Sequence, residues 1–131
     1  MKTTKNILFY AYMATTTGFI LHEMDAVYWK EWELFGITRD YPGLMVFILA
    51  HVLILPAVFW GMANLHRRQG LMISLVMACF GMAHFFLHAV LGKGYFVTGF
   101  SSGIINAIFI VSAAQLYLTI KLLKQKEAGA Q

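Results

Sequence analysis

Four histidines in apolar segments of the sequence could together bind one metal ion. They are His22, His51, His84 and His88. His84 and His88 are four residues apart, so on a helix they share a face and can offer two imidazoles to one ion. At 1.5 Å per residue, all four histidines lie within about 5–11 Å of the same end of their segments. The sequence therefore predicts that these four histidines are ligands of a shared metal site.

Two carboxylates accompany the first histidine. His22 and Asp25 share a helix face, so Asp25 could fix the ring orientation of His22 or bind the metal itself. Glu23 points about 100° away on the same helix, so it is a ligand at the edge of the site or a surface group. If the site is catalytic, a water on the metal would be the nucleophile, and Glu23 or Asp25 would be the general base. Near a membrane boundary, both carboxylates would also be tolerated without any function.

Imidazole and carboxylate ligands suit zinc or non-haem iron better than copper(I). We therefore expect a membrane-embedded metal-binding protein, and specifically a metalloenzyme that acts on an apolar small molecule at the outer half of the bilayer. One alternative is a haem held by His51 and either His84 or His88, in an electron carrier or a haem enzyme. The others are a small proton-coupled transporter or channel subunit, and a structural accessory subunit whose polar layer holds helices together.

The elements that carry these residues are expected to be transmembrane helices. The 131 residues are 60% hydrophobic and 12% charged, whereas soluble domains are about half apolar and a quarter charged. Four apolar segments, at about 7–27, 44–64, 71–91 and 96–120, are near the ~20 residues that cross a bilayer as a helix. Short connections predict an all-α integral membrane protein, a single antiparallel four-helix bundle. The stretch KEWELF, residues 30–35, is expected to extend the first helix by a turn or two.

The basic residues predict the orientation. Seven lie on the side of the termini: Lys2, Lys5, Arg67, Arg68, Lys121, Lys124 and Lys126. Three lie on the other side: Lys30, Arg39 and Lys93. This bias favours both termini in the cytoplasm of a bacterial inner membrane. The membrane topology thus explains the net charge of +4, and we expect that the protein does not bind nucleic acid. We expect it to lie in the lipid bilayer, and assembly into a homo-oligomer stays open. His66, in the basic turn, is expected to have no part in the metal site.

The stretch HEMDAVYWKEWELF is similar to the signature of an uncharacterised family of small four-helix bacterial membrane proteins. The similarity rests on His22, Glu23, Asp25, Glu31 and Trp32, in the pattern HExDxxxxxEW. It covers the first third of the chain and, more loosely, the layout of four segments. The resemblance implies a four-helix bacterial membrane protein and implies no activity.

Overall fold

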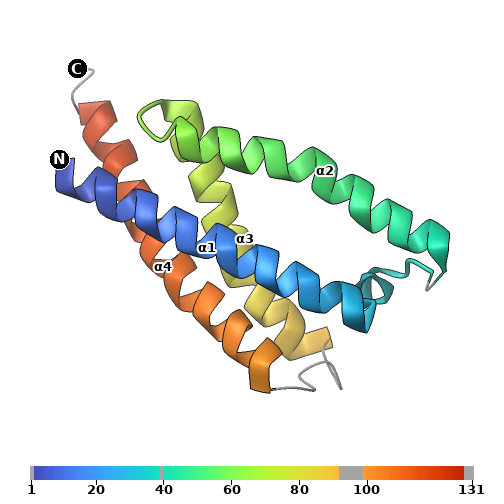
Figure 1. Ribbon diagram of the computed structural model, residues 1–131. Helices are drawn as coiled ribbons and strands as arrows, with labels where there is room; N and C mark the ends of the chain where they lie inside the picture. The colour runs from blue at the N-terminus through green and yellow to red at the C-terminus, as the bar shows by residue number, and fades with distance from the viewer. Residues whose placement is uncertain (1, 39, 92–98, 129–131) are drawn as a thin grey trace.

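The computed structural model describes residues 2–38, 40–91 and 99–128, which form four α-helices and one short 3-10 helix (Figure 1). The helices are α1 (Lys2–Trp29), η1 (Glu31–Phe35), α2 (Tyr41–Ala63), α3 (Arg68–Leu91) and α4 (Gly99–Ala128). The described residues contain no β-strand. The predicted all-α fold with four long helices is confirmed. Residues 96–98, the expected start of the fourth segment, lie outside the described residues.

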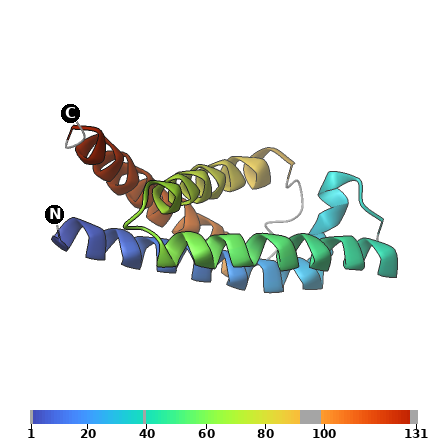
Figure 2. The same cartoon turned by 90° about the horizontal axis from the view of Figure 1, so that it is seen from above.

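Successive helices run in opposite directions (Figure 1). Helix α4 packs along both α3 and α1, whereas α2 packs mainly on α3 and touches α1 at few points. Both termini and the α2–α3 turn lie at one end of the bundle in both views, and η1 lies toward the other (Figures 1 and 2). At the first end, the Lys126 ammonium donates a hydrogen bond to the His66 carbonyl oxygen at 2.6 Å. We call these two ends the terminal end and the η1 end.

Three of the helices are long and apolar enough to cross a membrane: α2, α3 and α4, the last counted from Ser101. Helix α1 is not among them. Its buried face carries polar side chains, including Thr15, Thr16 and His22, and these lower its mean hydropathy. Its exposed face nevertheless carries large apolar residues such as Tyr10 and Met24. Helix α1 therefore directs these three polar side chains into the bundle.

Close packing of α3 on α4 fixes the helix that carries two of the histidines. A β-carbon on Gly81 would overlap the hydroxyl of Ser112 on α4, so glycine at this position allows the two backbones to approach closely. Further along, the Ser74 and Thr119 hydroxyls are hydrogen-bonded at 2.8 Å, and the Gln115 amide donates to the Ser74 carbonyl oxygen at 3.0 Å. These buried contacts join the two helices in register.

The chain reverses where the sequence was expected to continue the first helix. Helix α1 ends at Trp29, and Lys30 adopts a left-handed conformation with φ of 55°. The KEWELF stretch then forms η1, which is followed by Gly36, also left-handed with φ of 73°. Trp32 is buried, and its indole N–H donates to the Thr38 carbonyl oxygen at 2.9 Å. The reversal turns η1 back against the bundle instead of lengthening α1.

Asp40 ends this connection and caps α2. Its carboxylate accepts hydrogen bonds from the Thr38 hydroxyl and from the Gly43 backbone N–H. These two donors, the hydroxyl first, hold the pKa of the Asp40 carboxyl below its usual value of 3.8. Such a side-chain cap satisfies one of the backbone N–H groups that have no partner within the helix.

Candidate metal centre

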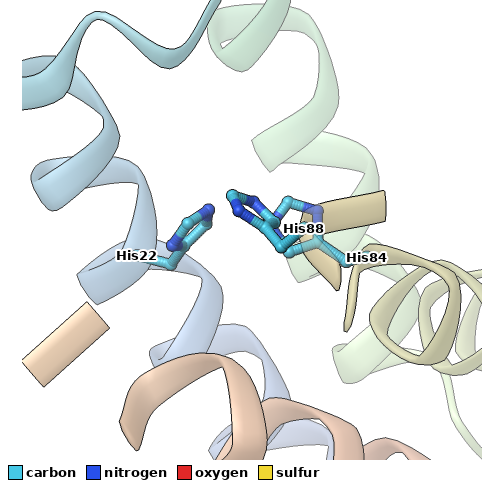
Figure 3. Close-up of side chains that lie close together, drawn as sticks. All are labelled: His22, His84 and His88. Carbon is cyan, nitrogen blue, oxygen red and sulfur yellow. The ribbon is translucent and has the colours of Figure 1, made fainter. Parts of the chain in front are cut away.

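Three of the predicted histidines meet at the η1 end of the bundle. His22 on α1 faces His84 and His88 on α3 (Figure 3). The three rings are almost fully buried, and one ligand atom from each lies within 4.8 Å of the others. The ring centroids are 4.6 Å apart for His22 and His84, and 5.0 Å apart for His22 and His88. The structure thus brings together side chains that are more than 60 positions apart in the sequence.

A buried carboxylate lies beside two of these histidines. Glu31, the first residue of η1, places Oε2 at 3.4 Å from His22 Nε2 and at 3.6 Å from His88 Nε2. The Nε2 atoms of His84 and His88 are 3.1 Å apart. Neighbouring ligand atoms of a tetrahedral zinc ion are about 3.3–3.4 Å apart, since each bond is about 2.0–2.1 Å long. The three observed separations, 3.1–3.6 Å, lie around this value.

The protein alone does not satisfy all the polar atoms of the cluster. Among the described residues, Glu31 Oε1 and His22 Nδ1 are buried and have no hydrogen-bond partner. A buried carboxylate is costly unless it is paired or coordinates a metal. The cluster therefore combines the ligand types and the spacing of a divalent-cation site with a buried carboxylate oxygen that has no hydrogen-bond partner among the described residues.

Aromatic packing supports the cluster on its side toward the terminal end. Phe19 stacks on Phe80 with ring centroids 5.3 Å apart, and it meets the His84 ring edge-on at 5.5 Å. Phe19 and Phe80 are one helical turn before His22 and His84, in agreement with the helix repeat. This aromatic layer restricts the rotamers of the histidines next to it.

The fourth predicted ligand, His51, lies outside this cluster and pairs with Glu23. The two atoms His51 Nε2 and Glu23 Oε2 are 3.2 Å apart. His51 Nδ1 lies 2.7 Å from the Phe47 carbonyl oxygen. A carbonyl oxygen only accepts, so Nδ1 carries a hydrogen and donates it. Both ring nitrogens of His51 therefore have partners, the Phe47 carbonyl oxygen and the Glu23 carboxyl group.

Asp25 and His66 also have defined places. Asp25 accepts a hydrogen bond from the Ser101 hydroxyl and so links α1 to α4. No hydrogen bond joins Asp25 to His22 Nδ1, the partner that the sequence suggested for it. His66 follows α2 at the terminal end, where it accepts a hydrogen bond from Arg67 Nε at 3.2 Å. Neither residue is part of the three-histidine cluster.

Sequence reasoning did not include Glu31 among the ligands. Its signal was present, because it lies nine residues after His22 in the quoted stretch HEMDAVYWKEW. The expected continuation of the first helix would have placed it about two turns beyond His22. Only the reversal at Lys30 returns the Glu31 carboxylate to the histidines.

The cluster lies in the wall of a cavity of about 500 Å³ between α1, α2, α3 and η1. At the η1 end, this cavity is lined by the four cluster residues, by the His51–Glu23 pair and by Trp32. Toward the terminal end its wall is apolar apart from Thr16 and includes Phe19, Ile54, Leu55, Val58, Met77 and Phe80. A volume of this size is typical of small-molecule sites. The polar groups of the lining are thus gathered in the η1 half of the cavity, where apolar residues such as Val27, Ile37 and Val46 also line it, and we call this half its polar end.

A family of unknown function (DUF6713) matches residues 6–122 of the chain. The chain belongs to this family. No curated protein and no solved structure matches it. The match agrees with the resemblance in giving an uncharacterised family, and it carries neither an activity nor information on bacterial origin or on the HExDxxxxxEW stretch.

Proposed function

We propose that the protein is a membrane-embedded metal-binding protein that holds one zinc or iron ion through His22, His84, His88 and Glu31. The observation that carries this proposal is the spacing of the donor atoms, 3.1–3.6 Å in three of the pairs that the four side chains form. Three buried imidazoles each place one ligand atom within 4.8 Å of the others, and the buried Glu31 carboxylate lies beside two of them. This set replaces His51 with Glu31, because both ring nitrogens of His51 have partners.

The ligand chemistry favours zinc or iron(II). Imidazole suits both ions, and non-haem iron sites commonly combine histidines with one carboxylate. Catalytic zinc can add a fifth ligand. Such an ion would act as a Lewis acid toward an oxygen atom of a molecule in the cavity. The cavity adjoining the cluster therefore supports a metalloenzyme with an apolar substrate rather than a closed structural site.

The proposal places all four helices across the membrane. Helix α1 packs along α4, which is itself apolar enough to cross. The exposed side of α1 is apolar over much of its length, as a lipid-facing surface requires, with Ile7, Tyr10, Met13, Leu21 and Met24 exposed. The seven basic residues belong to the terminal end, so the cytoplasmic side of a bacterial inner membrane is the proposed location of both termini. The metal centre then lies in the outer half.

The haem alternative has less support. It needs a ring nitrogen of His51 for the iron, and that side chain is engaged by the Phe47 carbonyl oxygen and by Glu23. Its partner histidine would be His84 or His88, whose rings are in mutual contact with centroids 4.6 Å apart. Binding of a haem would therefore break the contacts of His51 with Phe47 and Glu23 and the contact between the His84 and His88 rings. An absorption spectrum of the purified protein distinguishes the two, because only haem gives a Soret band.

Metal content per protomer, measured by mass spectrometry on gently purified protein, tests the proposal. We expect about one zinc or iron ion in the wild type and a large loss in His84→Ala and in His88→Ala, since loss of one of four ligands weakens binding strongly. His66→Ala is the matched control and should retain the metal. A wild type without metal would overturn the proposal, as would a metal that depends equally on His66. If His84→Ala retains the metal and His88→Ala loses it, His84 is not one of the ligands.

A further inference from the structure

The cavity beside the cluster has an asymmetric lining that indicates the kind of molecule it accepts. On α3, the lining begins with the apolar Met77 and Phe80 and ends with His84 and His88. This stretch of eleven residue steps is about 16 Å long. On α1, the lining passes from the apolar Phe19 to the polar His22 and Glu23 and then continues with the apolar Met24, Ala26 and Val27. A ligand that matches this wall is largely apolar and carries one polar group that reaches the histidines.

The polar end of the cavity restricts the charge of that group. The Glu23 and Glu31 carboxylates both line it. An ammonium group on the ligand has no lone pair for a metal ion, and an ionised carboxylate has no hydrogen to donate to Glu23. A neutral group can offer both a lone pair and a hydrogen.

The same end requires a group that both donates and accepts. A metal ion needs a lone pair from the ligand, and the Glu23 carboxylate needs a hydrogen-bond donor. A carboxylate can accept about four hydrogen bonds, and the contact with His51 uses one side of Glu23. A hydroxyl group provides an O–H donor and oxygen lone pairs in one atom. Ketones and aldehydes lack the donor.

We propose that the cavity binds a membrane-soluble alcohol whose hydroxyl group lies between the metal centre and the His51–Glu23 pair, with its hydrocarbon part along the apolar wall. This inference rests on the proposed metal centre. We place the opening for such a molecule between α1 and α2, which touch each other at few points. In the proposed membrane orientation that side faces lipid, so the alcohol enters from the bilayer.

Trp32 provides a reporter of binding, because it lines the polar end of the cavity and is 3% exposed. In a Trp29→Phe, Trp60→Phe variant, Trp32 is the remaining tryptophan of the three. The zinc-loaded variant in lipid nanodiscs is titrated with a dodecanol brominated on the carbon next to the hydroxyl-bearing carbon. Bromine on contact quenches indole fluorescence. Bromododecane and the matching bromododecanoic acid, at equal mole fraction in the lipid, are the comparison probes.

We expect the alcohol to quench Trp32 at a concentration about 10- to 100-fold lower than bromododecane does, the range for a hydrogen bond to a charged group. Glu23→Leu, in the same background, should reduce this preference at least about tenfold, and the contact with the metal should keep it above one. Glu33→Leu, which makes the same replacement on η1 at a residue that does not line the cavity, is the matched control and should keep it. Zinc content is measured on the same samples.

The outcomes separate this inference from the proposed metal centre. Zinc that binds normally, with equal quenching by the alcohol and the bromoalkane, overturns the inference and leaves the metal centre standing. Stronger quenching by the acid overturns the choice of a hydroxyl group. If metal-free His84→Ala prefers the alcohol over the bromoalkane as strongly as the zinc-loaded protein does, the metal does not contact the hydroxyl group. Absence of zinc from the wild type counts against the metal centre itself.

Discussion

Replacing Glu31 by glutamine tests the ligand that the sequence did not reveal. Glu31→Gln keeps the size of the side chain but removes the charge 3.4 Å from His22 Nε2 and 3.6 Å from His88 Nε2. Protein sites with four ligands bind zinc with an apparent free energy of about 10–16 kcal/mol, or about 2.5–4 kcal/mol per ligand. Because 1.4 kcal/mol is a factor of ten, we expect the dissociation constant for zinc to rise about 10²- to 10³-fold.

The assay is a competition titration in detergent, in which a chromophoric chelator and the protein share a limited amount of zinc. Glu33→Gln is the control, since Glu33 lies on the same 3-10 helix but does not line the cavity. Circular dichroism of the metal-free proteins verifies that both variants remain folded. If Glu31→Gln binds zinc within a factor of about three of the wild type while folded, the carboxylate is not a ligand.

Three further outcomes follow from the packing and the charges. Gly81→Ala should destabilise the fold by about 1–3 kcal/mol through overpacking against the Ser112 hydroxyl, and adding Ser112→Ala should restore part of the thermal stability. Zinc at a concentration of a hundred times its dissociation constant should stabilise the folded wild type by about 2.7 kcal/mol. A thermal scan should show this as a higher unfolding midpoint. An unfolding midpoint that zinc does not change would contradict binding to the folded state. Hydrogen bonds from the Thr38 hydroxyl and, second, from the Gly43 backbone N–H lower the pKa of Asp40 in the folded protein below 3.8. The Asp40 carboxylate therefore stabilises the fold above pH 3.8, and this stabilisation is lost as the pH falls through the pKa of the folded protein. The midpoint difference between metal-free wild type and Asp40→Asn should therefore be full near pH 6 and shrink below pH 3.8, and a difference that grows in acid would refute this.

The sequence was sufficient to predict four helices, because hydropathy and short connections limit the chain to a few arrangements. It was also sufficient to predict that His84 and His88 share a face, and that His22 lies at their depth. Depth alone placed His51 in the same set. It could not show that the ring of His51 contacts Glu23 instead, since this depends on the packing of α2 against the other helices.

The position of Glu31 could not be read from the sequence for a different reason. It depends on a left-handed residue at Lys30, and non-glycine residues adopt that conformation rarely. No local pattern in KEWELF marks the reversal. The apolar cavity was equally hidden, because it arises where α1 and α2 fail to pack closely, and a hydropathy pattern does not report how far apart two helices lie.

X-ray absorption at the zinc edge, on protein loaded with one equivalent of zinc in nanodiscs, is a direct test of the proposed metal centre. We predict a first shell of nitrogen and oxygen atoms at about 2.0–2.1 Å, with the outer-shell scattering of three imidazole rings. Glu31→Gln should keep the imidazole signal, and His22→Ala should reduce it to two rings. A first shell of water oxygens with one imidazole or none, or failure of the protein to retain one zinc ion, would contradict a metal centre built from His22, His84, His88 and Glu31.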